Sequence, residues 1–209
     1  STLLPTLLSL SWRSLFTAPT PYSMELITMM NLKPTLHTAF ALTLLTAAVA
    51  CSQDTDVAGS NAGFVAVLQP TDGNDVSGTV QFSDTPNGVR VSVDISGLDP
   101  ATSHGFHIHE FGDCSAGDAS SAGGHFNPGG EPHGAPQDVQ RHAGDLGNVT
   151  ANSAGVAQTS LLDTELMMYG EHSVLGHAVV IHANADDLQS QPAGDAGPRL
   201  ACGVIAAAN

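Results

Sequence analysis

The sequence predicts an all-β fold for residues 62–209, an antiparallel sandwich or flattened barrel of about eight short strands. Apolar and polar residues alternate over 89–95, which is typical of a strand with one buried face. Dipeptides that favour turns, such as Asn87-Gly88, separate this run from its neighbours. No segment of this region has a convincing helical pattern, and aromatic residues make up only 5% of the chain. We therefore expect a core built mainly from Val, Leu, Ile and Ala.

The expected strands are short and evenly spread, except where two loops interrupt them. They begin with the alternating run from Phe64 to Leu68 and continue at 89–95, 103–109, 147–151, 155–161, 177–183 and 201–206. The loops are 110–145 and 184–199, and the first is rich in Gly, Pro, Ser, Asp and His. A loop of about 35 residues is uncommon in a compact domain unless it is functional. Its histidines indicate that a metal ion organises it.

Residues 1–50 have the composition of a targeting segment that is cleaved from the mature protein. Lys33 precedes an apolar run over 35–50, which ends in small residues immediately before Cys51. A basic start, a short apolar run and a small-residue end are typical of a secretory signal peptide. The run is too short for a comfortable membrane span. We expect translation to start at Met24, Met29 or Met30, with residues 1–23 as upstream sequence.

Cys51 extends this interpretation to a membrane anchor. A run of small residues ending in cysteine resembles the signal of a bacterial lipoprotein, in which the cysteine becomes the lipidated first residue. Ordinary signal cleavage nearby is the alternative. The small polar residues of 51–61 are expected to form a flexible tether. The chain is therefore expected in the periplasm, or anchored to the outer membrane, of a Gram-negative-type bacterium.

The charge of the chain excludes one class of partner. The whole chain has a formal net charge of −15, and from Cys51 onward three arginines stand against nineteen acidic residues, a formal charge of −16. A surface this acidic repels the phosphate backbone of DNA or RNA, so we expect no nucleic-acid partner. A membrane contact is expected only through a lipid on Cys51.

The chain contains ten histidines, and eight of them lie from His107 to His182. His107 and His109 lie two residues apart on an expected strand, so both point to the face opposite Phe106 and Ile108. His182 ends another expected strand. Two imidazoles on one strand face can chelate one metal ion, and His182 is a third candidate ligand from a different strand.

The long loop contains a second set of candidate ligands, His125, His133, His142 and Asp145. Three neutral imidazoles and one carboxylate make a closed four-coordinate shell, which is typical of structural zinc. His107, His109 and His182 need one more imidazole to complete an all-nitrogen shell, which favours copper.

The remaining histidines have no obvious spacing partner. His104 is expected to make structural hydrogen bonds, and His172 and His177 to lie on the surface. If Cys51 is lipidated, Cys114 and Cys202 are the two remaining cysteines. In an exported protein they are expected to form a disulfide, and two free buried thiols are the alternative.

Five stretches of the sequence resemble copper/zinc superoxide dismutase, in the family's order, over roughly 62–206. They are GFHIHEFGDC (105–114), SAGGHFNP (121–128), RHAGDLGNVTA (141–151), VVIHANADDL (179–188) and GDAGPRLACGVI (194–205). The resemblance implies a Greek-key barrel that binds one copper and one zinc per chain. It also implies dismutation of superoxide to oxygen and hydrogen peroxide.

The resemblance assigns a role to each candidate residue. It implies copper ligands at His107, His109, His125 and His182, zinc ligands at His125, His133, His142 and Asp145, and a disulfide between Cys114 and Cys202. His125 is then a shared bridge, which leaves the copper on reduction and carries a proton to the departing peroxide. Asp186 matches the carboxylate that links a copper ligand to a zinc ligand, and Arg199 matches the arginine that attracts the anion.

Two departures from the family pattern affect these expectations. Cys114 lies five residues after His109, as in many bacterial members, which favours the bacterial exported type. The loop 184–199 is short and contains no lysine, so electrostatic steering of the substrate depends on fewer cations. A non-catalytic copper-delivery protein and an adhesion sandwich with incidental metal are the competing interpretations. The sequence leaves monomer and homodimer open.

Overall fold

The computed structural model describes residues 63–208, so the predicted signal peptide, tether and lipidation site all lie outside the described residues. This part of the chain forms eight β-strands and one short 3-10 turn. They are β1 (Phe64–Pro70), β2 (Ser77–Thr85), β3 (Gly88–Ser96), β4 (Ser103–His109), η1 (Ser120–Ala122), β5 (Asp145–Thr150), β6 (Ala157–Asp163), β7 (Ala178–His182) and β8 (Arg199–Ala207). Within it, no helix is long and apolar enough to cross a membrane.

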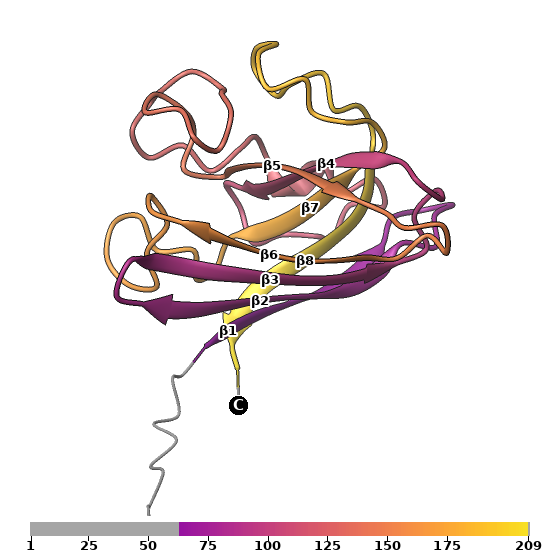
Figure 1. Cartoon of the computed structure of the whole chain (residues 1–209), viewed down its shortest axis with the longest axis horizontal. Helices are drawn as coiled ribbons and strands as arrows, with labels where there is room; N and C mark the ends of the chain where they lie inside the picture. Colours follow the sequence, from indigo (N-terminus) through magenta and orange to yellow (C-terminus); the bar gives the residue numbers. More distant parts are fainter. Residues whose placement is uncertain (1–62, 209) are drawn as a thin grey trace, which may run out of the picture. The chain divides into compact units, whose positions relative to one another are not determined.

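The strands form one antiparallel sheet that bends into a nearly closed barrel (Figure 1). Their order is β5-β4-β7-β8-β1-β2-β3-β6, and β8 pairs with both β1 and β7. The consecutive strands β3 and β4 are not neighbours, because β6 pairs with β3 and β7 pairs with β4. The chain thus crosses from one half of the barrel to the other between β3 and β4, in agreement with the expected Greek-key arrangement.

The core fills the space between the two halves of the barrel. In β3 the residues Val89, Val91, Val93 and Ile95 are buried, while Arg90 and Asp94 between them are exposed. The largest fully buried side chains include only two phenylalanines, Phe82 and Phe106, and the core is otherwise mainly aliphatic. The alternation therefore predicted both the strand and its buried face. β2, which has no clean alternation, was not among the expected strands.

The outer face of β4 and β7 is covered by loops. Phe106 and Ile108 point into the core, so His107 and His109 lie on the opposite face as predicted. Neither histidine is solvated, however, because they are only 0% and 1% exposed. The loops 110–144 and 183–198 shield this face from water.

Two covalent or ionic links hold the long loop against the barrel. The predicted disulfide joins Cys114 to Cys202 in β8, with the two Cα atoms 5.8 Å apart. Near the other end of the loop, the buried guanidinium of Arg141 forms an ion pair with Asp163 at 2.7 Å. The same guanidinium donates hydrogen bonds to the backbone carbonyls of His142 and Ala143. The loop is thus fixed at both ends to strands that belong to the rigid sheet.

Candidate metal centre

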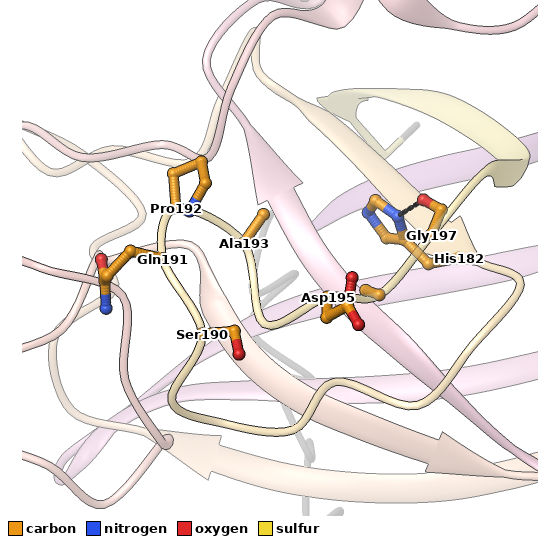
Figure 2. A pocket seen from close by; sticks show the side chains of 8 residues that line it. His182, Ser190, Gln191, Pro192, Ala193, Asp195 and Gly197 are labelled. Atoms are coloured by element: carbon orange, nitrogen blue, oxygen red, sulfur yellow. Dashed lines mark hydrogen bonds between the residues drawn. The ribbon is translucent and has the colours of Figure 1, made fainter.

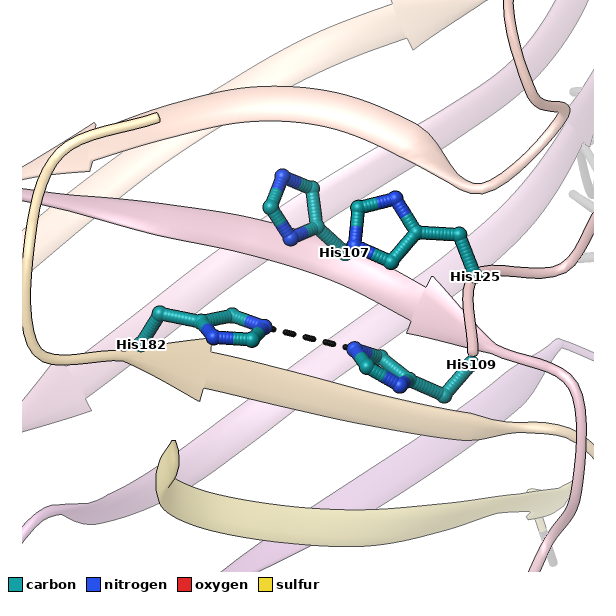
Figure 3. A group of neighbouring side chains, drawn as sticks. All are labelled: His107, His109, His125 and His182. Carbon is teal, nitrogen blue, oxygen red and sulfur yellow. Dashed lines mark hydrogen bonds between the residues drawn. The ribbon is translucent and has the colours of Figure 1, made fainter. Parts of the chain in front are cut away.

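Four histidines from three parts of the chain form the first cluster, shown in Figure 3. His107 and His109 come from β4, His182 from the end of β7, and His125 from the long loop. One ring nitrogen of each lies within 4.8 Å of those of the others. His125 reaches the strands through an isolated β-bridge with His109. The sheet therefore fixes three members, and the bridge fixes the fourth.

Hydrogen bonds to the outer ring nitrogens determine which nitrogen of each imidazole points into the first cluster. The Nδ1 of His109 donates to the carbonyl of Gly123 at 2.9 Å, and the Nδ1 of His182 to that of Gly197 at 3.0 Å. A carbonyl oxygen only accepts, so both rings carry their proton on Nδ1 and leave the Nε2 lone pair free. These two Nε2 atoms lie 3.3 Å apart.

The second cluster converges on one carboxylate oxygen. The Oδ1 atom of Asp145 lies 2.7 Å from Nδ1 of His125, 3.0 Å from Nδ1 of His133 and 3.1 Å from Nδ1 of His142. The other oxygen, Oδ2, accepts the backbone N–H groups of Gly134 at 3.0 Å and His142 at 2.9 Å. Because Asp145 is fully buried as the first residue of β5, this carboxylate has a fixed position.

His125 belongs to both clusters, one through each ring nitrogen. Its Nδ1 faces Asp145, and its Nε2 is buried without a hydrogen-bond partner. The Nδ1 atom of His107 is buried and unpartnered in the same way, whereas Nδ1 of His133 lies 3.0 Å from Oδ1 of Asp145. Each such atom costs roughly 1–3 kcal/mol when nothing binds it. Cations coordinated by these lone pairs would remove that cost, so the residues fit two metal ions that share His125.

Asp186 connects the clusters from outside, as predicted. Its Oδ2 accepts from Nε2 of His107 at 2.8 Å, and its Oδ1 accepts from Nε2 of His133 at 3.0 Å. These bonds place the protons on Nε2, so both rings turn Nδ1 toward the cluster positions. One carboxylate therefore orients a ligand of each cluster.

Sequence reasoning missed the residue that positions Asp186. The side-chain oxygen of Asn148 accepts the backbone N–H of Asp186 at 2.7 Å, and its amide nitrogen donates to the Asp186 carbonyl at 2.9 Å. Asn148 lies on β5, three residues after Asp145. The only available signal was its place within the stretch 141–151, since an asparagine in a strand has many roles.

The environment prepares the first cluster to bind a metal at neutral pH. Burial lowers the pKa of His125 to about 4, and burial together with the charge of His107 lowers that of His182 to about 3. Burial and the charge of His125 lower the pKa of His109 as well. All three imidazoles are thus neutral at pH 7, and no bound proton competes for their lone pairs.

The second cluster favours positive charge instead. Burial alone would lower the pKa of His133, but hydrogen bonds with Asp145 and Asp186 raise it to about 9. Burial would likewise raise the pKa of Asp145, yet hydrogen bonds from the three histidines around it hold that pKa well below its usual range. Two ionised carboxylates next to buried imidazoles create a strong local preference for a cation.

Arg199 is held beside the first cluster by two backbone carbonyls. Its guanidinium donates to Ala119 at 2.5 Å and to Gly123 at 2.6 Å. The carbonyl of Gly123 also accepts from His109, so one peptide group positions both the cation and a cluster histidine. A cavity of about 350 Å³ opens next to His182, shown in Figure 2. Arg199 itself is half-buried and lines a second cavity of about 410 Å³, and Gly197 borders both cavities.

The structure brings every predicted ligand into the predicted cluster, and it separates the other histidines from them. His104 is structural as expected, with Nδ1 donating to the carbonyl of His182 at 2.9 Å. His177 is half-buried and packs its ring on Phe126 at a centroid distance of 3.9 Å. Neither His172 nor His177 belongs to a group of metal-binding side chains in the described residues.

Comparisons with known proteins agree with this geometry. The family model described as copper/zinc superoxide dismutase (SODC) matches residues 76–205. The chain is 50% identical to "Superoxide dismutase [Cu-Zn] 2" of Mesembryanthemum crystallinum over 139 residues, 63% of this chain and 88% of that protein. It is 47% identical to "Superoxide dismutase [Cu-Zn]" of Cordyceps militaris over 142 residues, 64% of this chain and 92% of that protein.

A solved structure supports the same relationship. The crystal structure of the clock protein EA4 superimposes with a TM-score of 0.64 at 41% identity, over 70% of this chain and 94% of that one. The family match at 76–205 includes both clusters, Asp186 and Arg199, so the likeness extends from the barrel to the site. The chain therefore belongs to the copper/zinc superoxide dismutase family and is an enzyme that converts superoxide to oxygen and hydrogen peroxide with a copper and a zinc ion.

Proposed function

We propose that copper binds the all-histidine cluster and zinc the cluster that contains Asp145. The proposed copper ligands are His107, His109, His125 and His182. The proposed zinc ligands are His125, His133, His142 and Asp145. Four imidazole nitrogens suit copper, whereas three imidazoles and a carboxylate form the closed tetrahedral shell of a structural zinc site. The observation that carries the proposal is His125, whose two ring nitrogens face different clusters.

The residues around the copper position have separate tasks in the proposed reaction. Bound copper supplies the redox chemistry, accepting an electron from one superoxide and giving it to a second, which takes up two protons. Arg199 attracts each anion toward the cluster. Nε2 of His125 would take up a proton from water after the first superoxide is oxidised and give it to the departing peroxide, with water supplying the second proton, while Nδ1 faces Asp145. His109 and His182 keep their orientation because backbone carbonyls accept from their Nδ1 atoms.

Replacing one ligand of each cluster tests the metal assignment. We expect His109→Ala to lose copper and activity but retain zinc. We expect His133→Ala to lose zinc before it loses copper. Loss of an outer partner of a metal ligand costs about 10–100-fold in affinity, so loss of the ligand itself should cost more. Metal content by mass spectrometry and superoxide consumption measure both effects.

The matched control is His172→Ala, which removes a histidine outside both clusters. Equal metal loss in this control, or copper retained by His109→Ala, would contradict the assignment. One copper and one zinc per chain without any superoxide consumption would favour the copper-delivery alternative.

The role of Arg199 predicts a change in rate and in its salt dependence. At about 4 Å and an effective dielectric constant of about 20, the attraction between one cation and one anion is at most roughly 4 kcal/mol. Arg199 is half-exposed, so we expect Arg199→Ala to lower kcat/KM by roughly tenfold at low salt. Its rate should also fall less with ionic strength than that of the wild type. Stopped-flow decay of superoxide at several salt concentrations measures both.

Arg90→Ala is the control, because it removes the same charge from an exposed position on β3. We expect it to leave the rate within twofold of the wild type. An Arg199→Ala variant with wild-type rates at every salt concentration would refute the role of this residue.

We infer that the chain is exported and that Cys51 is its lipid anchor, with residues 1–50 removed. The apolar run after Lys33 and the small residues before Cys51 support this. The Cys114–Cys202 disulfide agrees with an oxidising compartment. Domain boundaries at 50 and 61 would leave the domain 62–209 on a short tether, in the periplasm or at the outer membrane. Defence against external superoxide would follow from this location.

Expression of the full chain in a Gram-negative host tests the anchor. We expect the wild type to fractionate with membranes and to incorporate labelled palmitate, because two acyl chains or more give stable anchoring. Cys51→Ser should abolish the label and leave unprocessed or soluble protein, whereas Ser52→Ala should behave as the wild type. A wild type that is soluble and unlabelled would refute lipidation.

We also propose that the enzyme is a homodimer that associates through an apolar patch formed by Val67, Phe111, Leu175 and Val204. These side chains are 54%, 51%, 44% and 40% exposed. They lie together, because β1 pairs with β8 and Gly112 packs closely against Gly176 and Val204. The sequence alone had revealed no such patch, because its members are far apart along the chain.

A second copy of the chain is the partner that fits the patch best. The outward residues of β1 and β8 here, Val65, Val67, Val204 and Ala206, are all uncharged. Two chains with a charge near −16 repel one another elsewhere, but not across an uncharged strip. Apolar side chains that meet across a two-fold axis would be removed from water.

Introducing a charge into the patch tests the dimer. We expect Val204→Glu to convert a dimer into a monomer in light scattering after size exclusion, because two carboxylates would face a desolvated interface. Val139→Glu is the matched control, since Val139 is 95% exposed in the long loop. A wild type that is monomeric at tens of micromolar would refute the proposal.

A further inference from the structure

Two carboxylates lie beside the route that an anion would take to the first cluster. Asp195 lines the cavity next to His182, and Figure 2 shows its side chain near that ring. Asp118 lines a neighbouring cavity of about 410 Å³ together with Arg199. Both side chains are exposed. Asp118 therefore lies in the same cavity as Arg199, and Asp195 lies in the adjoining cavity beside His182, with Gly197 bordering both.

Arg199 has no help from other cations in opposing these charges. Residues 63–208 contain no lysine and only two other arginines. Arg141 is buried in its ion pair with Asp163, and Arg90 lies on β3 in the other half of the barrel. The local potential beside Arg199 thus depends on one guanidinium and on nearby carboxylates, which are Asp118 and Asp72 in the same cavity and Asp195 in the adjoining one.

The charge of Asp118 acts directly on Arg199. Burial lowers the pKa of the Arg199 guanidinium, and the negative charge of Asp118 opposes that shift. Hydrogen bonds from Ser120 lower the pKa of Asp118, so this carboxylate is ionised at neutral pH. Its Oδ1 accepts the backbone N–H of Ser120 at 2.9 Å, which fixes the carboxylate at the start of the short 3-10 turn.

Asp195 has an unusual backbone conformation for a residue with a side chain. Its φ is 50°, in the left-handed region. Aspartate and asparagine enter this region more readily than most residues. No ion pair joins Asp195 to another of the residues 63–208, so no neighbouring cation offsets its charge.

We propose that Asp118 and Asp195 are specificity residues that keep multivalent anions out of the copper site, at the expense of superoxide capture. This inference rests on the proposed roles of Arg199 and the copper cluster. The effect of a local potential on binding grows with the charge of the anion. A carboxylate that lowers the affinity of a monoanion by some factor lowers that of a dianion by the square of that factor. The pair therefore discriminates between superoxide and anions such as phosphate or sulfate.

The expected magnitude follows from Coulomb's law. At about 10 Å in a water-like dielectric, removal of one charge changes the affinity for a monoanion about twofold and for a dianion about fourfold. Each single substitution should therefore raise kcat/KM for superoxide about twofold at low ionic strength. Salt should reduce these gains, because the Debye length at 0.1 M is about 10 Å.

The experiment compares Asp118→Asn, Asp195→Asn and the double variant in the copper- and zinc-loaded protein. Asparagine keeps the Oδ1 acceptor for Ser120, and it tolerates the left-handed backbone at position 195. Azide serves as the monoanionic probe and phosphate at pH 8 as the dianionic probe. Absorption titrations give their dissociation constants, and stopped-flow decay of superoxide gives kcat/KM. Asp195→Gly is a second variant in case Asp195→Asn folds poorly, because glycine adopts the left-handed region without strain.

Asp94→Asn is the matched control, because it removes the same charge from an exposed position on β3. We expect azide to bind about twofold and phosphate about fourfold more tightly in each single variant, with no change in the control. Equal gains in Asp94→Asn, or equal factors for azide and phosphate, would overturn the inference.

Failure of this inference is distinguishable from failure of the proposed site. If Arg199→Ala weakens azide binding while the aspartate variants leave both anions unchanged, the site stands and the specificity role is wrong. If Arg199→Ala changes neither azide nor phosphate binding, the proposed anion route itself is wrong.

Discussion

The whole metal centre depends on the carboxylate of Asp145, which joins an irregular loop to a rigid sheet. One of its oxygens meets three imidazoles that come from widely separated places in the long loop. The residue itself begins β5 and is in register with His107 of β4. A loop of this length would lose much conformational entropy on ordering. The convergence of buried charge, hydrogen bonds and coordinated metal offsets that loss, and places His125 between the strand histidines and the loop histidines.

A single peptide group connects the metal centre to Arg199. The carbonyl of Gly123 accepts from His109 and from Arg199, which lie on β4 and β8. The disulfide from Cys114 ties the beginning of this loop segment to Cys202, three residues from Arg199. The cation and the copper-site histidine therefore share one acceptor, and neither can move far without the other. In the proposed function, the backbone of the long loop thus links the cation that would attract the anion to a histidine that would bind the metal.

Much of this arrangement could be predicted from the sequence, because strands impose a simple rule on side-chain direction. Period-two alternation fixed the buried face of β3, and the same rule placed His107 and His109 on one face of β4. The spacing of residues within a loop does not determine the direction of their side chains. The sharing of His125 therefore came only from the family resemblance, and the structure then provided its geometry.

The functional groups that could not be predicted from the sequence have a common physical cause. Gly123 and Ala119 act through backbone carbonyls, which every residue type possesses, so no side chain marks them in the sequence. Asn148 acts through bonds to the backbone of Asp186, thirty-eight residues away. The apolar patch also joins residues from distant segments. Each of these features depends on which segments meet in space, and composition and periodicity do not contain that information.

Charge at the site explains how an acidic chain can act on an anion. The copper-cluster histidines are neutral at pH 7, because burial lowers the pKa of His109, His125 and His182. They therefore supply lone pairs and no positive charge. Asp145 lies in the second cluster and Asp186 connects both clusters, so their negative charges offset part of the positive charge of the metals. Under the proposed assignment, the attraction of superoxide comes from the copper ion and Arg199 acting over a short distance. Net charge acts over longer distances and is screened by salt, so a local cation in a partly water-excluded cavity can dominate it.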